Sequence, residues 1–212
     1  WNYPNIITSA GNSLLLAVGS ATLIMFITAV ITWIVVKTDI TGRWFLDNLA
    51  SLPLVFPGLV LGLAIMNFYL HVDLGIYGTL WILLFAYITR FLPYGMRYNT
   101  ASMLQIHKEL EESAAISGAS WSTIFKKIIL PLIKPGFIAG WIYIVIVSIR
   151  ELSASILLYS AGTEVISVVI WELWEGGQYV QLSALGVLLI IGLFFLVILA
   201  QILAGRSGLK TA

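Results

Sequence analysis

The chain has 212 residues, of which 60% are hydrophobic and only 10% are charged, and its net charge at neutral pH is +1. Soluble chains are about half apolar and about a quarter charged, so a mean hydropathy of +1.00 excludes an ordinary soluble domain and predicts a protein of the lipid bilayer. The absence of cysteine excludes disulfides and thiolate metal sites.

Crossing the hydrocarbon core takes about 20 apolar residues in a helix, and five segments of the chain meet that length. They cover residues 12–36, 49–70, 76–98, 136–158 and 182–204. The pattern predicts an all-α polytopic membrane protein with five transmembrane helices, forming a single transmembrane domain over residues 1–212. Because the sequence begins with Trp1 and has no positively charged leader, we expect a piece of a longer chain or a processed one.

Two prolines near the start of the second segment, Pro53 and Pro57, each remove a backbone donor, so we expect that helix to be kinked or partly unwound. Lipid does not satisfy the freed carbonyl groups, so neighbouring helices must cover the gap. Glycines spaced four residues apart let another helix approach closely; such pairs are Gly58 and Gly62 in the second segment, and Gly136 and Gly140 in the fourth. These features suit either helix packing alone or a distorted helix that lines a transport pathway.

Residues 99–135 form the one long polar connection, between the third and fourth segments. The helix expected there carries three carboxylates in its first turn, where they suit its positive end: Glu109, Glu111 and Glu112. Gly118 ends this helix, because glycine readily takes the left-handed conformation that follows a last turn. Ser120 can cap a second, amphipathic helix, and Pro131 excludes further regular turns of it. The pattern predicts a short helix, a sharp turn and a second helix.

Lysine and arginine are retained on the cytoplasmic side of membrane proteins, so their distribution predicts the orientation. Residues 1–11, 71–75 and 159–181 contain none. Nine lie on the other side: Lys37, Arg43, Arg97, Lys108, Lys126, Lys127, Lys134, Arg206 and Lys210. We therefore expect the amino end outside, and the 99–135 connection and the carboxyl end in the cytoplasm. Residues 165–174 are too short to span and predict a helix near the outer surface, either an interfacial anchor or a docking surface for an external binding protein.

Arg150 and Glu151 lie inside the fourth segment, roughly 20 Å from its cytoplasmic end at the rise of a helix. Ionisable groups at that depth face a protein interior or a wet cavity, and sequence neighbours do not share a helix face, so each needs a partner from elsewhere. Arg90 lies nearer the cytoplasmic end, where we expect it to snorkel. Two interpretations of Arg150 and Glu151 are open: structural ion pairing or, with Ser153 and Arg90, a place in the translocation path.

The sequence contains no phosphate-binding Gly-x-x-x-x-Gly-Lys-[Ser/Thr] loop, no His-Glu-x-x-His zinc motif and no Gly-x-Ser-x-Gly elbow. We therefore expect a protein that is not an enzyme, without a metal or cofactor of its own. If ATP drives transport, the energy must enter through another subunit. The helix over residues 109–118 suits that contact, because Ser113, Ala114 and Ala115 are small enough to lie deep in a partner's groove.

The 99–135 connection resembles the signature loop of the membrane subunits of type I ABC importers, which depend on a solute-binding protein. The spacing Glu-x-Ala, three residues, Gly, nine residues, Ile-x-Leu-Pro is met by Glu112, Ala114, Gly118, Ile128, Leu130 and Pro131. Ser113 stands where the family pattern has a second small residue, alanine. In such importers the loop helix docks on a dimer of cytoplasmic ABC ATPase subunits, which carry ATP and Mg²⁺. Two permease domains then rock between inward- and outward-open states.

The resemblance implies that the ATPase contacts a set of residues on this loop, namely Glu111, Glu112, Ser113, Ala114, Ala115 and Gly118. It also implies that the chain is a transport subunit, with an external solute-binding protein, a second permease domain as a homodimer or tandem half, a prokaryotic inner membrane location and no nucleic-acid partner. A different class, an ion-coupled secondary transporter or channel with Arg150 and Glu151 as its charged relay, is the alternative.

Residues 150–159 and 162–167 look like the second half of the tandem permeases for ferric iron, so ferric iron is the substrate that we expect. Thiamine, phosphonate, polyamine or sulfate are the alternatives, because related permeases carry them and selectivity often resides in the separate binding protein.

Overall fold

The computed structural model describes the backbone of residues 4–72 and 75–206, and the side chains of residues 6–72 and 75–198. Within these ranges its regular structure is entirely helical, which confirms the all-α part of the expected fold class. In chain order the elements are α1 (Pro4–Lys37), α2 (Arg43–Ser51), the 3₁₀ turn η1 (Leu52–Val55), α3 (Gly58–His71), α4 (Leu80–Met103), α5 (Lys108–Ile116), α6 (Trp121–Ile124), the π-helical turn η2 (Phe125–Ile129), α7 (Leu130–Ile149), α8 (Ser155–Leu158), α9 (Ile166–Glu175) and α10 (Tyr179–Arg206).

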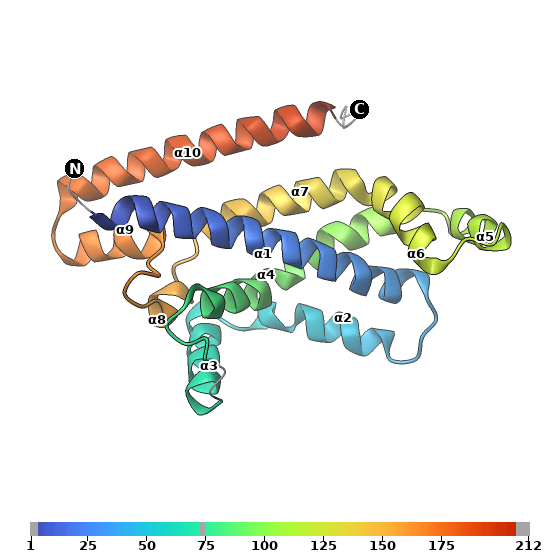
Figure 1. Ribbon diagram of the computed structural model, residues 1–212, viewed down its shortest axis with the longest axis horizontal. Coiled ribbons are helices and arrows are strands. Elements are labelled where there is room, and N and C mark those ends of the chain that lie inside the picture. The colour runs from blue at the N-terminus through green and yellow to red at the C-terminus, as the bar shows by residue number, and fades with distance from the viewer. Residues whose placement is uncertain (1–3, 73–74, 207–212) are drawn as a thin grey trace.

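Three long helices, α1, α4 and α7, pack against one another and form the core (Figure 1). Glycines set their close spacing: a methyl group added to Gly95 of α4 would come within 2.6 Å of Ile24 on α1. One added to Gly140 of α7 would come within 2.8 Å of the Cβ atom of Tyr98 on α4. Gly136 likewise abuts α4, at Ser102, so the close approach expected at Gly136 and Gly140 is confirmed, with α4 as the partner helix. Of the other predicted pair, Gly58 meets the Arg90 side chain of α4 and Gly62 lies against Ala154.

Three helical stretches of the described chain are long and apolar enough to cross a bilayer, Ile6–Lys37, Trp121–Ile149 and Tyr179–Ile198. The bent pair Arg43–Val55 and Gly58–His71 makes a fourth if it is one span. The third expected span corresponds to α4, which carries two arginines and three tyrosines and packs against both α1 and α7. Length and composition therefore account for three or four of the five expected spans.

The second expected span is interrupted at its two prolines. Pro53 lies in η1, Pro57 is the N-cap of α3, and the chain bends by 110° between the two halves. Figure 1 shows α3 pointing across the long direction of the molecule, along which α1 and α2 lie side by side. The segment is thus two separate helices joined at a break rather than one kinked rod, because neither proline offers an N–H to continue the helical hydrogen bonds.

The fourth expected span, 136–158, was wrong at both ends. The helix begins at Trp121 and runs through η2 into α7, so Pro131 does not end it. Pro131 sits in the first turn of α7, directly after the π-helical turn, where its missing N–H is tolerated. At the other end α7 stops at Ile149, and the chain is non-helical until α8 begins at Ser155.

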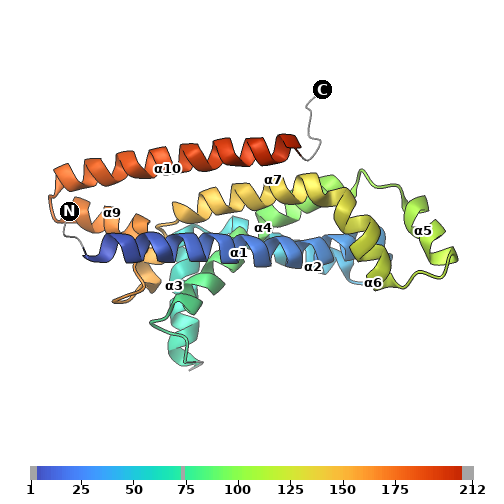
Figure 2. The same cartoon turned by 45° about the horizontal axis from the view of Figure 1, so that its top comes forward.

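The remaining elements define two ends and one side of the molecule. The start of α1 lies at one end with α9, whereas α5 and α6 lie at the opposite end (Figures 1 and 2). The short helix expected over residues 165–174 is confirmed as α9. Beside the core lies α10, which touches α9 and α7. Only 6% of the most apolar 18-residue stretch of α10 is buried. A long apolar surface of this kind suits contact with lipid or with a further membrane helix.

Candidate functional site

The α5–α6 elbow projects beyond the ends of the long helices (Figures 1 and 2). It has the form that the sequence predicted: α5 ends at Ile116, and Gly118 follows in the left-handed conformation with φ 83°. The N–H groups of Gly118 and Ala119 donate to the last carbonyls of α5. The Ser120 hydroxyl then accepts from the N–H of Thr123 and caps α6.

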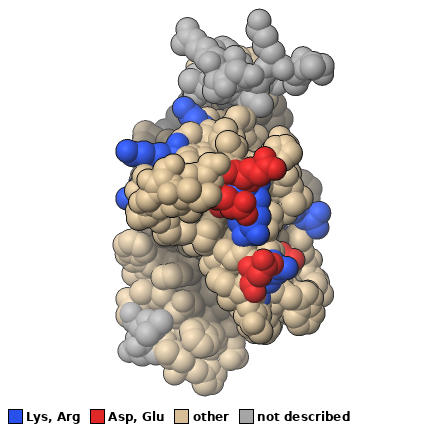
Figure 3. All heavy atoms as spheres, turned by 90° about the vertical axis from the view of Figure 1, so that its right-hand side faces the viewer, with Lys and Arg blue, Asp and Glu red and all other residues tan. Residues whose placement is uncertain are grey.

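The two faces of α5 differ in exposure. Glu112, Ser113 and Ala115 are exposed, and Ile116 at the helix end is 88% exposed. Ala114 is half-buried and packs against the apolar cluster at this end of the core. Figure 3 views the molecule from this end and shows acidic and basic side chains gathered around its centre. The elbow therefore offers an exposed face of small and acidic residues.

Glu111 points the other way, toward α1. Its Oε1 lies 3.3 Å from Nζ of Lys37, and its Oε2 accepts a 3.0 Å hydrogen bond from Nε1 of Trp33. The Lys37 and Glu111 side chains are only 6% and 13% exposed. Lys37 also donates to the carbonyl of Ile106, in the connection between α4 and α5. The Trp33 ring packs edge-on against Trp121 of α6, with 5.2 Å between centroids. We call Trp33, Lys37 and Glu111 the α1–α5 clasp.

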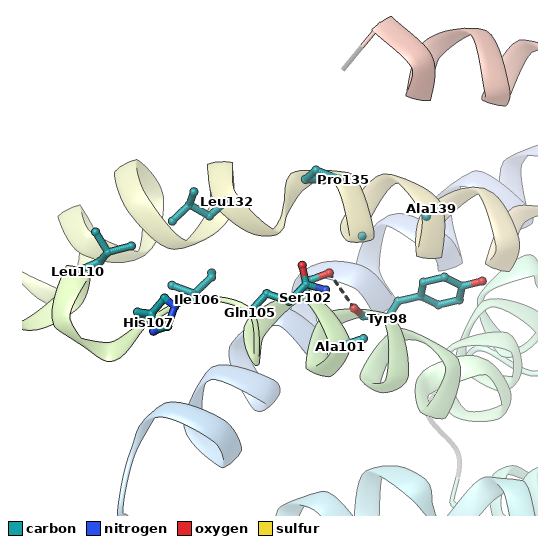
Figure 4. A pocket seen from close by; sticks show the side chains of 11 residues that line it. Tyr98, Ala101, Ser102, Gln105, Ile106, His107, Leu110, Leu132, Pro135 and Ala139 are labelled. Atoms are coloured by element: carbon teal, nitrogen blue, oxygen red, sulfur yellow. Dashed lines mark hydrogen bonds between the residues drawn. The ribbon is translucent and has the colours of Figure 1, made fainter. Parts of the chain in front are cut away.

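A groove of about 510 Å³ lies beside the elbow, between the end of α4, α5 and the start of α7 (Figure 4). Tyr98 and Ser102 from α4 and Pro135 from α7 line it, together with His107 and Leu110 near α5. The hydroxyl of Ser102 donates to the Tyr98 carbonyl within the groove, as the dashed line shows. This groove is mainly apolar, and it lies along α4 and α7 on the side where the elbow is attached.

The second constellation lies at the break between α7 and α8. Glu151 is 6% exposed, and its Oε2 lies 2.8 Å from Nε of Arg90 on α4. The Nε–H bond does not point along this line, so the contact is an ion pair rather than an aligned hydrogen bond. The other oxygen, Oε1, accepts from the N–H of Ala154 at 2.9 Å, which caps the start of α8. The expectation that Arg90 snorkels was therefore wrong, because the end of α7 turns Glu151 toward α4.

Hydroxyl groups satisfy the backbone at this break. The carbonyl of Glu151 accepts hydrogen bonds from Ser155 at 2.9 Å and from Ser167 of α9 at 2.7 Å. Tyr87 of α4 lies 2.8 Å from the Ser155 hydroxyl and completes the network. Buried backbone groups that leave a helix inside an apolar region need such partners, and here three elements supply them. The sequence offered no local sign of this network, because its members are distant along the chain.

Arg150 and Ser153, the other two candidates for the translocation path, are placed differently. The Arg150 side chain is exposed and has no ion pair or hydrogen bond to any residue that the structure describes. Ser153 is half-buried in the turn before α8. The structure thus joins Arg90 to Glu151 and leaves Arg150 outside that pair. No group of three or more His, Cys, Asp or Glu side chains suited to a metal ion occurs in the described part of the chain.

Residues 30–208 match the family described as the inner membrane component of binding-protein-dependent transport systems. The chain belongs to this family. It is 25% identical over 190 residues to a ferric iron transport system permease, FbpB 2, of Haemophilus influenzae. It is 27% identical over 203 residues to the spermidine/putrescine permease PotC of Escherichia coli. The matches cover 90% and 96% of this chain, but 38% of the ferric iron permease and 76% of PotC.

This chain has the same fold as a chain of a solved ABC transporter. The chain superposes on a chain of the MetNI methionine ABC transporter with a TM-score of 0.78 at 16% identity, covering 98% of this chain and 99% of that one. The family match makes this chain an inner membrane component of a transport system, and it includes both the elbow and the α7–α8 break. The chain spans well under half the length of the ferric iron permease.

Proposed function

We propose that this chain is the permease domain of an ATP-driven type I ABC importer, which passes a solute from an external binding protein across the inner membrane by alternating access. The observation that carries the proposal is α5. It is a short helix outside the core whose exposed residues Glu112 and Ser113 belong to the signature pattern, while the shielded carboxylate of Glu111 ties its other face to α1. The chain has no ATP-binding loop of its own, so ATP and Mg²⁺ belong on the partner subunits.

In the proposed topology five segments cross the membrane, namely α1, the bent α2–α3 pair, α4, the α6–α7 helix and α10. The elbow end faces the cytoplasm and the α9 end faces the exterior. Support comes from the charges: Lys37, Lys108 and Lys126 lie at the elbow end, whereas the helix α9 and its flanks carry no lysine or arginine. Of the residues counted for orientation, Lys210 and the side chain of Arg206 lie outside the described residues.

The proposed partners follow from this topology. A dimer of ABC ATPase subunits docks on the exposed face of α5 in the cytoplasm, and an external binding protein docks near α9. A second permease domain, either another copy or the other half of a tandem chain, covers part of the apolar surface of the described helices. We place the translocation path between the two domains, on the side of the exposed Arg150 and the nearby Ser153. The Arg90–Glu151 pair belongs to the framework.

Ferric iron is the proposed solute, because the match to a ferric iron permease covers 90% of the chain and because residues 150–159 look like that group of permeases. The similarly close match to PotC makes a polyamine the second candidate. The ion-coupled alternative is disfavoured by the geometry of Glu151. A relay carboxylate must change partners, whereas Glu151 is held by Arg90 and by the N–H of Ala154.

The test pairs two charge reversals on exposed glutamates at opposite ends, Glu112→Lys on α5 and Glu175→Lys on α9. The chain is produced with its ATPase and binding protein, and ATP-dependent uptake into proteoliposomes is measured together with copurification of the ATPase. We expect Glu112→Lys to lower both by about tenfold or more, as loss of a central docking residue does, and Glu175→Lys to keep ATPase binding. Full uptake by the Glu112 variant, or uptake without any ATPase, contradicts the proposal.

A further inference from the structure

Within the described chain, the polar side-chain contacts between α5 and a membrane helix all pass through one residue. Glu111 uses one carboxylate oxygen for Lys37 and the other for Trp33, both on the last turns of α1. Trp33 and Lys37 lie four residues apart and therefore share a face of α1. The neighbouring Glu112, which belongs to the signature spacing, is exposed and joins none of this. The two adjacent glutamates thus serve opposite faces of α5.

We infer that the α1–α5 clasp transmits the displacement of α5 to α1, so that Lys37 and Glu111 position the elbow for coupling without touching the ATPase. This inference rests on the proposed function, because it assumes that an ATPase moves α5. It assigns Glu111, which the sequence resemblance groups with the docking residues, to the joint between the elbow and the core.

The clasp is suited to carry force because it is shielded and because Glu111 meets both Lys37 and Trp33. Lys37 and Glu111 are 6% and 13% exposed, so salt and water screen their attraction little. Lys37 also binds the Ile106 carbonyl, so the connection between α4 and α5 meets the same ammonium group. Separating the pair would leave a charge in an apolar cluster, which makes α5 and α1 move together rather than apart.

The exposed ion pair nearby shows the contrast. Arg43 and Asp39 lie four residues apart at the same end, 3.0 Å from each other, with side chains 43% and 83% exposed. Pairs of that kind contribute little and separate readily in water. The covalent route from α5 to α6 passes through the left-handed turn at Gly118, around which the structure leaves open space. The clasp therefore ties α5 to the core independently of that turn.

Beyond the clasp, α1 reaches the α7–α8 break. Lys37 and Ser20 are 17 positions apart, which is about 26 Å along a helix. The Ser20 hydroxyl lies 3.4 Å from that of Ser148, in the last turn of α7 just before Arg150. Along this length α1 packs against α4 and α7, so it moves as a rod rather than bending locally. A displacement of the clasp along α1 is therefore transmitted to Ser148, next to Arg150 at the proposed translocation path.

The test measures transport per ATP hydrolysed in the complete transporter, reconstituted in proteoliposomes with its ATPase and binding protein. Lys37→Met and Glu111→Gln each remove one charge of the clasp, and Trp33→Phe removes the indole donor together with part of the ring that packs against Trp121. Asp39→Asn is the matched control, since it breaks the exposed pair at the same end. We expect the clasp variants to bind the ATPase and to hydrolyse ATP, while transport per ATP falls about tenfold, within the usual range of coupling free energies.

The charge exchange Lys37→Glu with Glu111→Lys separates coupling from simple loss of folding, because it restores the pair without restoring the sequence. We expect it to recover a substantial part of the transport per ATP that the single variants lose. An unchanged ratio in Glu111→Gln overturns the inference, as does loss of ATPase binding as severe as in Glu112→Lys. If the unaltered chain shows no ATP-dependent uptake, the proposed function itself fails, whatever the clasp variants do.

Discussion

The ion pair between Arg90 and Glu151 makes the most quantitative prediction about the core. Replacing Glu151 by Gln removes the negative charge but keeps an oxygen that can accept from the N–H of Ala154, now 2.9 Å from Oε1. The perturbation therefore isolates the contact with Arg90, whose Nε lies 2.8 Å from Oε2. Replacing Glu151 by Ala removes both interactions at once.

The magnitude follows from burial. Breaking a fully buried pair costs about 3–5 kcal/mol, but Arg90 is 25% exposed and can regain water, so we expect about 2–4 kcal/mol for Glu151→Gln. Glu151→Ala also leaves the N–H of Ala154 without its acceptor, which adds about 1–3 kcal/mol. Arg90→Met leaves the carboxylate unpaired at a site where Glu151 is 6% exposed, so its cost should be of the same order as that of Glu151→Gln.

The assay is equilibrium unfolding of the purified chain in mixed detergent micelles, followed by loss of helix, for Arg90→Met, Glu151→Gln and the double variant. A direct contact predicts that the double variant costs less than the sum of the single ones by about 1–3 kcal/mol. If the costs add to within about 0.5 kcal/mol, the pair has no interaction of its own and the assignment of Glu151 to the framework is refuted.

Three further substitutions test separate parts of the structure. Gly118→Val forces a β-branched side chain into the left-handed region, at a cost of about 1–2 kcal/mol, so uptake should fall while membrane insertion, measured by fractionation, is kept. Gly58→Ala would overlap the Arg90 guanidinium and should lower thermal stability by about 1–3 kcal/mol, whereas Gly186→Ala, with open space around it, should not destabilise the chain. Arg150→Gln should leave unfolding within about 0.5 kcal/mol yet reduce uptake, and normal uptake would remove this arginine from the proposed path.

The sequence predicted the elbow well because its signals are local. The left-handed glycine at 118 and the cap at Ser120 act on the residues next to them, and both appear in the structure as expected. The difference between Glu111 and Glu112 was not available from the sequence, because it depends on where the last turn of α1 lies against α5. Lys37 and Trp33 could have been found only as an i, i+4 pair at the end of the first span.

The fourth span shows the opposite case. No glycine or proline marks residue 150, so the apolar run predicted a continuous helix to 158. In the structure α7 instead ends at Ile149. Beyond it, Glu151 pairs with Arg90, 61 positions earlier, and Tyr87 and Ser167 supply hydrogen bonds from other elements. A break stabilised by distant partners has no local signature. The same holds for Pro131, which a π-helical turn accommodates without ending the helix.

The break also explains why two adjacent charges have different environments. Once α7 ends at Ile149, Glu151 turns into the core and is neutralised by Arg90, whereas Arg150 is exposed and has no partner in the described structure. The Arg90–Glu151 pair is neutral, so the region retains one positive charge, on Arg150. An arginine in an apolar region needs an anionic or strongly dipolar partner. Ferric iron and a polyamine are both cations, so in the proposed importer that partner must come from the second permease domain. Arg150, which depends on that domain, rather than Glu151 should therefore respond in uptake measurements.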